Sequence, residues 1–175
     1  MAKRTGRPPA NACECGEHVW APLSKIGVTL VSPEDAHWLQ RRFWSYQDSK
    51  VDPHRVYAQS CIDYRSTLLH RAIMGEPKRQ VDHKNRNSLD NRRHNLRLAT
   101  GTQNAGNRRV SKNSSGYKGV TWRPDAKKWE ASLNAKGGYM YLGRFEDKHN
   151  AAEAYNAAAK SYFGEYANLN NVVRV

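Results

Sequence analysis

The sequence predicts an α+β protein with a small α+β lead-in, a ββα motif and a three-stranded antiparallel sheet packed on one helix. Three observations carry this prediction. Val81 to Asn104 has the order strand, turn, strand, short helix. Residues 117–145 alternate apolar and polar side chains over three segments, as in half-buried strands. An alanine-rich segment after Asp147 has the spacing of an amphipathic helix.

Length and composition favour small modules. The 175 residues allow one or two domains, and 38% hydrophobic residues with a mean hydropathy of −0.90 leave no excess for one large core. No apolar run approaches the ~18 residues of a membrane span, and the basic N-terminus lacks a hydrophobic signal core. We therefore expect a cytoplasmic protein with no membrane partner, whose three cysteines are reduced thiols.

Charge is unevenly distributed along the chain. Of the formal net charge of +13, residues 81–128 carry +9, from 12 basic and 3 acidic side chains. This concentration predicts a polyanionic partner, with DNA or RNA as the natural candidates and a solvated basic face as the alternative.

The N-terminal residues 1–27 are expected to form a basic flexible segment. Gly6-Arg7-Pro8 resembles the core of an AT-hook that lies in the minor groove, and a non-specific basic tail is the alternative interpretation. Cys13, Cys15 and His18 lie close together in sequence. A zinc site needs a fourth ligand and usually a Cys-x-x-Cys spacing, so a structural zinc is not expected there.

The lead-in alternates strand and helix patterns. Ser32 is the predicted N-cap of a helix that has Pro33 in its first turn, and Gly75 ends a second helix, in which His70 is expected to pack. The predicted strands are Val28–Val31, Phe43–Tyr46 and Val56–Ile62, and the predicted helices are Ala36–Arg42 and Thr67–Met74.

The stretch from Val81 to Asn104 carries the candidate chemistry. Gln80–His83 and Arg97–Thr100 are predicted strands that flank a turn-rich loop, Ser88–Arg92. Thr102 is expected to cap a short helix carrying Asn104. Such a ββα hairpin can bring Asp82, His83 and Asn104 to one point. A capped basic turn with solvated Asn and His side chains is the alternative.

These residue types suit phosphodiester hydrolysis. A neutral histidine near its ordinary pKa of about 6.5 can take a proton from water. A hard divalent cation on oxygen ligands can stabilise the developing charge and the leaving 3′ oxygen. One carboxylate and one amide oxygen leave room for water and substrate phosphate, which suits Mg²⁺.

The segments Asp82-His83, Asp90-Asn91, Asn95-Leu96 and Gln103-Asn104 resemble the HNH nuclease motif of phage-borne homing endonucleases. The resemblance implies a ββα-metal module within an HNH domain spanning 28–107, in a phage protein acting inside a bacterial cell. It further implies that His83 is the general base and that Asn95 orients it through a side-chain to backbone hydrogen bond. Asp82 and Asn104 would hold Mg²⁺ or Mn²⁺.

A polar stretch, 108–115, is expected to link this domain to a second module and to lie along phosphates. In the second module Pro124-Asp125-Ala126 and Lys136-Gly137-Gly138 are predicted turns. The predicted strands are Tyr117–Arg123, Trp129–Ala135 and Tyr139–Phe145. The side chains expected to face the core are those of Trp129, Ala131, Leu133, Met140 and Leu142. The side chains expected to face solvent are those of Glu130, Ser132, Asn134, Tyr139 and Tyr141. The following helix is expected to begin at Asp147, end at Gly164 and bury Ala151, Ala154, Tyr155, Ala158 and Tyr162.

Residues 116–170 resemble the Apetala/ethylene-response-factor DNA-binding domain. The matching stretches are Tyr117-Lys118-Gly119-Val120, Tyr141-Leu142-Gly143-Arg144-Phe145, Ala151-Ala152-Glu153-Ala154-Tyr155 and Ala167-Asn168-Leu169-Asn170. In that family the sheet lies in the major groove and the helix backs it. The resemblance implies DNA contacts at Lys118, Thr121, Arg123, Ser132, Asn134, Tyr139 and Tyr141. Several of these positions are arginine or tryptophan in the plant proteins, so the plant target sequence does not carry over.

The sequence as a whole predicts a metal-dependent endonuclease for double-stranded DNA, whose C-terminal module positions the cut. Further phosphate contacts are expected at Arg92, Arg93, Arg108 and Arg109. The alternative from another class is a DNA-binding regulator with an inactive HNH fold. An RNA-binding protein is disfavoured, because the sheet lacks the aromatic pairs of typical RNA platforms.

Overall fold

The computed structural model of the protein describes residues 10–24, 27–48, 56–62, 64–109, 113–135 and 138–174, with Ile62 described in its backbone only. The chain divides into two compact units, Met1–Leu98 and Ala99–Val175. Small sheets and short helices make up both, which confirms the predicted α+β class. Among the described residues, no helix is long and apolar enough to cross a membrane.

The first unit contains a four-stranded sheet in the order β1-β2-β3-β8. Its strands are β1 (Asn11–Ala12), β2 (Val19–Pro22), β3 (Val28–Val31) and β8 (Asp90–Asn91). The pairs are antiparallel except β3 with β8, which run parallel and align Leu30 with Asp90 and Val31 with Asn91. This parallel pair fixes the position of the loop after His83.

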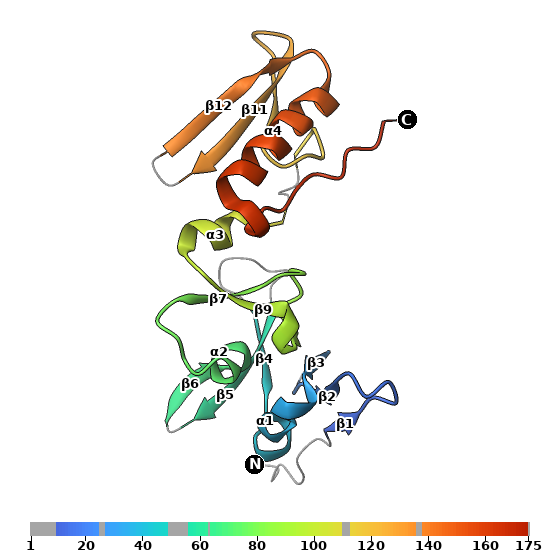
Figure 1. Ribbon diagram of the computed structural model, residues 1–175, viewed down its shortest axis with the longest axis vertical. Coiled ribbons are helices and arrows are strands. Elements are labelled where there is room, and N and C mark those ends of the chain that lie inside the picture. Colours follow the sequence, from blue (N-terminus) through green and yellow to red (C-terminus); the bar gives the residue numbers. More distant parts are fainter. Residues whose placement is uncertain are drawn as a thin grey trace. The chain divides into compact units, whose positions relative to one another are not determined.

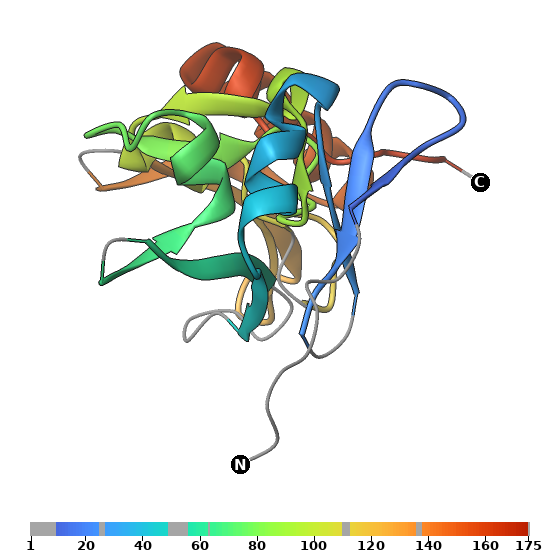
Figure 2. The same cartoon turned by 90° about the horizontal axis from the view of Figure 1, so that it is seen from below.

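The expectation of a flexible segment over 1–27 is wrong for residues 10–24. β1 and β2 form a hairpin, drawn in blue in Figure 2, and Val19, Ala21 and Leu23 enter the core. The alternation of Val19, Ala21 and Leu23 was the missed signal, since period-two burial is typical of a strand. Gly6-Arg7-Pro8 lies outside the described residues.

The helices of the lead-in are shorter than predicted. A 3-10 turn, η1 (Pro33–Asp35), precedes α1 (Ala36–Arg41), and the hydroxyl of Ser32 accepts a hydrogen bond from the backbone N of Arg93 instead of capping the helix. A three-stranded antiparallel sheet follows, formed by β4 (Ser45–Asp48), β5 (Val56–Ile62) and β6 (Arg65–Leu68). β6 takes the first part of the predicted second helix, so α2 covers only Leu69–Ile73, and Gly75 follows it with a φ of 73°.

One apolar core joins these elements. Val19 and Ala21 of β2, Val31 of β3, Leu39 of α1 and Leu69 of α2 are buried in it together. Val81 and Leu96 bring the last strands of the unit onto the same core. β7 (Gln80–His83) matches its predicted bounds and pairs with β9 (Leu96–Ala99), and η2 (Arg93–Asn95) lies between them. The core therefore anchors both strands that flank the candidate site.

The second unit begins with α3 (Gly101–Gly106), which carries Asn104. Thr100, not Thr102, is its N-cap: the Thr100 hydroxyl accepts from the Gln103 backbone N, and the Gln103 side chain accepts from the Thr100 backbone N. This reciprocal pair is a capping box. Gly106 lies against Phe163, where an added Cβ would come within 2.6 Å of the ring, so α3 packs closely on the C-terminal helix.

The second unit contains the predicted antiparallel sheet, with α4 lying across one face (Figure 1). Its strands are β10 (Val120–Arg123), β11 (Lys128–Ala135) and β12 (Gly138–Phe145). A register shift between Ala131 and Ser132 places Ala131 opposite Gly143 but Ser132 opposite Tyr141. The predicted turn at 136–137 lies outside the described residues, while Met140, expected to face in, is 41% exposed.

Helix α4 (Lys148–Phe163) begins at Asp147, whose carboxylate accepts from the His149 backbone N at 2.6 Å. Gly164 ends it and opens a short 3-10 turn, η3 (Gly164–Tyr166). Both ends were predicted correctly. The buried stripe differs from the prediction, because Phe163 packs in the core and Tyr162 is 40% exposed. The buried members are Ala151, Ala152, Tyr155, Ala159 and Phe163.

The predicted linker 108–115 is only partly a connection between modules. Asn113 and Ser115 form a hydrogen-bonded turn at the start of the sheet, in which the buried Ser115 hydroxyl donates to the Val120 carbonyl. Asn170 closes the same region by bonding both the N and the O of Lys118. Residues 110–112 lie outside the described residues.

Candidate active site and DNA-binding face

His83 ends β7 and is 6% exposed. Its Nε2 lies 3.2 Å from Oδ1 of Asn91, a residue of β8. The Asn91 amide nitrogen donates to Thr29 Oγ1 at 2.8 Å and to the Leu89 carbonyl at 3.3 Å. The Thr29 hydroxyl donates in turn to the Leu89 carbonyl, so it can only accept from Asn91. The Asn91 amide is thus oriented with its oxygen toward the histidine.

This orientation selects the tautomer of His83. An amide oxygen accepts hydrogen bonds and cannot donate them, so the His83 nitrogen that contacts it carries the proton. In the neutral ring Nε2 is then the donor and Nδ1 the basic nitrogen. Asn91 belongs to the motif segment Asp90-Asn91, but the sequence indicated no role for it. The missing signal was Thr29, which lies 62 residues earlier in the chain.

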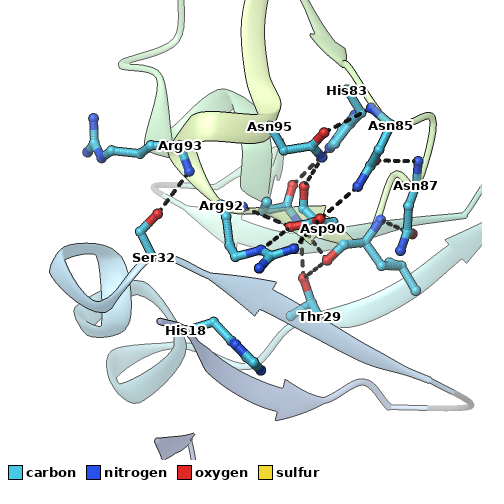
Figure 3. Close-up of polar contacts among 12 residues, drawn as sticks. His18, Thr29, Ser32, His83, Asn85, Asn87, Asp90, Arg92, Arg93 and Asn95 are labelled. Carbon is cyan, nitrogen blue, oxygen red and sulfur yellow. Dashed lines mark hydrogen bonds and ion pairs between the residues drawn. The ribbon is translucent and has the colours of Figure 1, made fainter. Parts of the chain in front are cut away.

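Asn95 cross-links the loop that follows His83. Its Oδ1 accepts from the backbone N of Asn85 at 2.9 Å, and its Nδ2 donates to the Asp90 carbonyl at 2.7 Å (Figure 3). Its own carbonyl accepts from the backbone N of Lys84. The side-chain to backbone bonds of Asn95 therefore join Asn85 and Asp90, on both sides of the loop. They hold the exit of β7, where His83 lies, against η2.

Asp82 is buried beside Arg97. The Arg97 Nε and Nη2 atoms both lie 2.9 Å from Asp82 Oδ2, and the two side chains are 10% and 7% exposed. Arg97 thus contacts the carboxylate at Oδ2. A carboxylate is a hard oxygen donor suited to Mg²⁺ or Mn²⁺, and an Arg97 contact at Oδ2 is compatible with such a ligand role. Arg97 was missed by sequence reasoning, which read it only as a strand residue.

His70 lies on α2 next to the site. Its ring is 5.0 Å, between centroids, from the His83 ring in an edge-on arrangement, and it is 6% exposed. Burial, reinforced by the charges of His83 and Arg71, lowers the pKa of His70 from 6.5 to about 3. The packed helix histidine that the sequence predicted is therefore a neutral neighbour of the candidate base.

Two of the arginines expected on phosphate have carboxylate partners inside the first unit. Arg92 contacts Asp90 through Nε and Nη2, each at 2.8 Å. Arg93 contacts Asp35 through Nε at 2.8 Å and Nη2 at 2.7 Å. The Arg92 guanidinium holds the pKa of Asp90 below its ordinary value despite the burial of that carboxylate. Both arginines fasten the loop around the site, a role the sequence did not indicate.

The strand register places most of the expected base contacts on one face of the second unit. Val120, Ala131 and Leu133 are buried under α4, so the alternate positions of the same strands form the opposite, outer face. Asn134, Tyr139 and Tyr141 are exposed there, the tyrosines at 56% and 55%. The predicted residues on this outer face are Thr121, Arg123, Ser132, Asn134, Tyr139 and Tyr141.

Glu130, expected to be solvated, is buried at the centre of this outer face. Its carboxylate accepts from Arg123 Nη2 and Tyr139 Oη, each at 2.6 Å, and from Arg144 Nε at 3.2 Å. These bonds hold the pKa of Glu130 down to about 2, with Arg123 contributing most. Arg123 is therefore not a free base reader, and Arg144 is an additional cation that sequence reasoning missed.

The remaining basic residues have different settings. Lys118 lies before β10 and its Nζ donates to the Gly106 carbonyl at 2.6 Å and the Arg108 carbonyl at 3.0 Å, which ties it to the end of α3. The side chains of Arg108 and Arg109 are exposed after α3. Asn104 lies on α3, in the second unit, whereas Asp82 and His83 lie in the first.

The expectation that no structural zinc binds at the N-terminal cysteines stays a prediction, because the structure shows only a possible site. The ligand atoms of Cys13, Cys15 and His18 all lie within 4.8 Å of one another, so a possible metal site exists without a Cys-x-x-Cys spacing.

Part of the chain is similar to known HNH endonucleases. Residues 70–105 match the family model described as HNH endonuclease. A protein of Acanthamoeba polyphaga mimivirus, named an uncharacterized HNH endonuclease, is 34% identical over 92 residues, which cover 53% of this chain and 47% of that protein. The HNH match includes His70, Asp82, His83, Asn91, Asn95 and Asn104. These matches support a nuclease function for the HNH segment.

Part of the chain is also similar to plant proteins. An AP2-like ethylene-responsive transcription factor of Arabidopsis thaliana is 40% identical over 60 residues, 34% of this chain and 12% of that protein. APETALA2-like protein 2 of Oryza sativa subsp. japonica is 40% identical over 57 residues, 33% of this chain and 13% of that protein. The chain thus spans about half of the viral relative and a small part of the plant ones. No solved structure matches the chain significantly.

Proposed function

We propose that this chain is a metal-dependent DNA endonuclease of the phage homing type, which hydrolyses phosphodiester bonds in duplex DNA. The observation that carries the proposal is the hydrogen bond from His83 to Asn91, with the Asn91 amide oriented by Thr29. A histidine with one nitrogen fixed as donor presents the other as a base. In this proposal the protein acts in the cytoplasm of an infected bacterial cell.

In the proposed reaction, Nδ1 of His83 takes a proton from water. The water oxygen then forms a bond to phosphorus, and the 3′ oxygen leaves with the electron pair of its P–O bond. Asn95 keeps His83 in place by closing the loop between Asn85 and Asp90. General-base catalysis of this kind typically contributes roughly 10²–10⁴-fold to a rate.

Asp82 and Asn104 are the proposed ligands of Mg²⁺ or Mn²⁺. Such an ion, when bound, neutralises charge on the phosphate and on the departing oxygen. Arg97 keeps the buried Asp82 carboxylate paired and in a fixed position. The carboxylate and amide oxygen donors fit a hard cation better than they fit zinc or copper.

The C-terminal module is proposed to place the cut. Its outer face offers Thr121, Ser132, Asn134 and two exposed tyrosines for contacts in the major groove. Arg123 and Arg144 lie on the same face, where both donate hydrogen bonds to the Glu130 carboxylate. Lys118, Arg108 and Arg109, together with Arg92 and Arg93, would add phosphate contacts. Few of these side chains are bidentate base readers, so site preference is expected to be loose.

One observation favours a second candidate, a DNA-binding regulator with an inactive HNH fold. Arg97 lies against Asp82, and a guanidinium at a metal ligand would block catalysis if it excluded the ion. The two candidates differ in cleavage and agree in binding.

A nicking assay separates them. The full chain is incubated with supercoiled plasmid in Mg²⁺, in Mn²⁺ and in excess EDTA, while binding to a short duplex is measured in parallel. The endonuclease predicts open-circle product that depends on the divalent ion and disappears with EDTA. DNA binding without any product in either metal would support the regulator, and undiminished cutting in EDTA would refute the metal mechanism.

A further inference from the structure

The turn between β1 and β2 gathers three side chains that could hold a metal ion. Cys13 and His18 are half-buried, Cys15 is exposed, and His18 directly precedes β2. Their ligand atoms lie within 4.8 Å of one another, so one small ion can contact all three. None of these residues takes part in the proposed hydrolysis.

The backbone shapes this turn for sulfur ligands. Cys13 N donates to the His18 carbonyl at 3.0 Å, which closes the hairpin. Gly16 N donates to the Cys13 carbonyl at 2.9 Å, and the Gly16 φ of 72° is in the left-handed region that favours glycine. Cys15 N lies 3.4 Å from Cys13 Sγ, so an amide is directed at a sulfur that would carry negative charge as a thiolate. The Cys-x-Cys-Gly order therefore brings both sulfurs to the same side.

The distance between Cys15 Sγ and His18 Nδ1, 3.5 Å, is the separation of a sulfur and a nitrogen bound to one tetrahedral zinc. The two sulfurs are 2.8 Å apart, beyond the roughly 2.05 Å of a disulfide bond, and binding of one tetrahedral ion would separate them to about 3.7 Å. Two thiolates and one imidazole form a borderline-soft donor set that zinc prefers among the abundant divalent metals. Mg²⁺, which the HNH site is proposed to use, prefers oxygen donors.

We propose that Cys13, Cys15 and His18 bind one zinc ion. These three are the protein ligands among the residues that the structure describes, and a solvent molecule is the fourth ligand. The ion closes the β1–β2 hairpin and has a structural role. β2 pairs with β3, and β3 pairs with β8, the strand that holds Asn91 against His83. The zinc site thus supports the sheet that positions the candidate base.

Metal content tests the site without any DNA. The full chain is produced in zinc-supplemented medium, dialysed and measured by elemental analysis, beside the variants Cys13→Ser, Cys15→Ser and His18→Ala. Cys61→Ser is the matched control, because Cys61 is exposed on β5 and lies outside the cluster. We expect one zinc per chain in the wild type and the control, and loss of bound zinc in both cluster serine variants. Absence of zinc from the wild type would overturn the proposal.

A second measurement uses only the wild type, in case a variant fails to fold. Zinc should protect two of the three thiols from a thiol-specific reagent, leaving Cys61 to react at once, and a chelator should release the other two. Replacement by Co²⁺ should give the visible bands of a tetrahedral site and a sulfur-to-metal charge-transfer band. Immediate reaction of all three thiols, or a mass two hydrogens lower from a Cys13–Cys15 disulfide in the purified protein, would contradict the site.

Discussion

The Nε2 atom of His83 lies 3.2 Å from the amide oxygen of Asn91, and both side chains are buried. The contact joins the end of β7 to β8, and Thr29 of β3 fixes the direction of the Asn91 amide. His83 is thus held by a hydrogen-bond chain that crosses three strands. The proposed chemistry depends on this chain.

Replacement of Asn91 by leucine should therefore lower cleavage by about 10- to 100-fold, because His83 would lose its orientation and its fixed tautomer. Asn91→Asp keeps an oxygen acceptor and should retain more activity than Asn91→Leu. The measurement is single-turnover plasmid nicking as a function of pH, with circular dichroism to check folding. Equal rates for wild type and both variants would show that the Asn91 contact has no part in catalysis.

His83→Ala should lower cleavage by roughly 10²–10⁴-fold, the range for loss of a general base, with little change in DNA affinity. His94→Ala is the matched control, because His94 is an exposed histidine of the same motif in η2. Nicking rates and duplex binding are measured for both. The assignment of His83 as base fails if its variant cuts as fast as the His94 variant.

Arg97→Ala should lower the free energy of unfolding by about 3–5 kcal/mol, since it removes the cationic partner of the buried Asp82 carboxylate. Arg71→Ala removes an arginine whose ion pair with Glu76 is far more exposed, at 31% and 53%, and that pair contributes about 0–1 kcal/mol. Urea denaturation of the two variants gives the comparison. A similar decrease in the free energy of unfolding for both variants would mean that burial does not strengthen the contribution of the Asp82–Arg97 pair to stability.

The neutral state of His70 makes stability depend on pH. Its pKa is about 3 in the fold and 6.5 ordinarily, so the unfolded chain binds the extra proton in that window. Stability is complete above pH 6.5 and falls toward pH 3, by up to about 1.4 kcal/mol per pH unit from this group. Urea denaturation at several pH values should show a smaller acid loss for His70→Gln than for wild type. Parallel curves for the two proteins would contradict the burial effect.

Arg123→Ala should weaken binding to a preferred duplex by about 1–3 kcal/mol and relax preference at one base pair, if Arg123 leaves Glu130 to read a guanine. A phosphate contact would instead weaken all duplexes equally with a shallower salt dependence. Arg174→Ala is the control, because Arg174 pairs with Glu153 of α4. Affinity equal to wild type on every duplex and at every salt concentration would remove Arg123 from the interface.

The sequence by itself determined the elements whose signals are local. The bounds of β3, β5 and β7 match the predicted ones, and Asp147 and Gly164 delimit α4 as predicted. The order of residues from Asp82 to Asn104 was also sufficient to indicate an HNH nuclease motif. These elements can be predicted from sequence because helix caps, turns and the alternation of buried and exposed side chains depend on residues only a few positions apart.

Only the tertiary structure decided which polar groups meet. Thr29 reaches Asn91 across 62 positions and Asp35 reaches Arg93 across 58, so no local pattern could pair them. The same holds for Glu130, which is buried because Arg123 and Arg144 from two other strands converge on it. A charged side chain is stable in the protein interior only when it is paired with an opposite charge or hydrogen-bonded. Which residue becomes its partner depends on the distance between the two in the folded chain, and the sequence alone does not specify that distance.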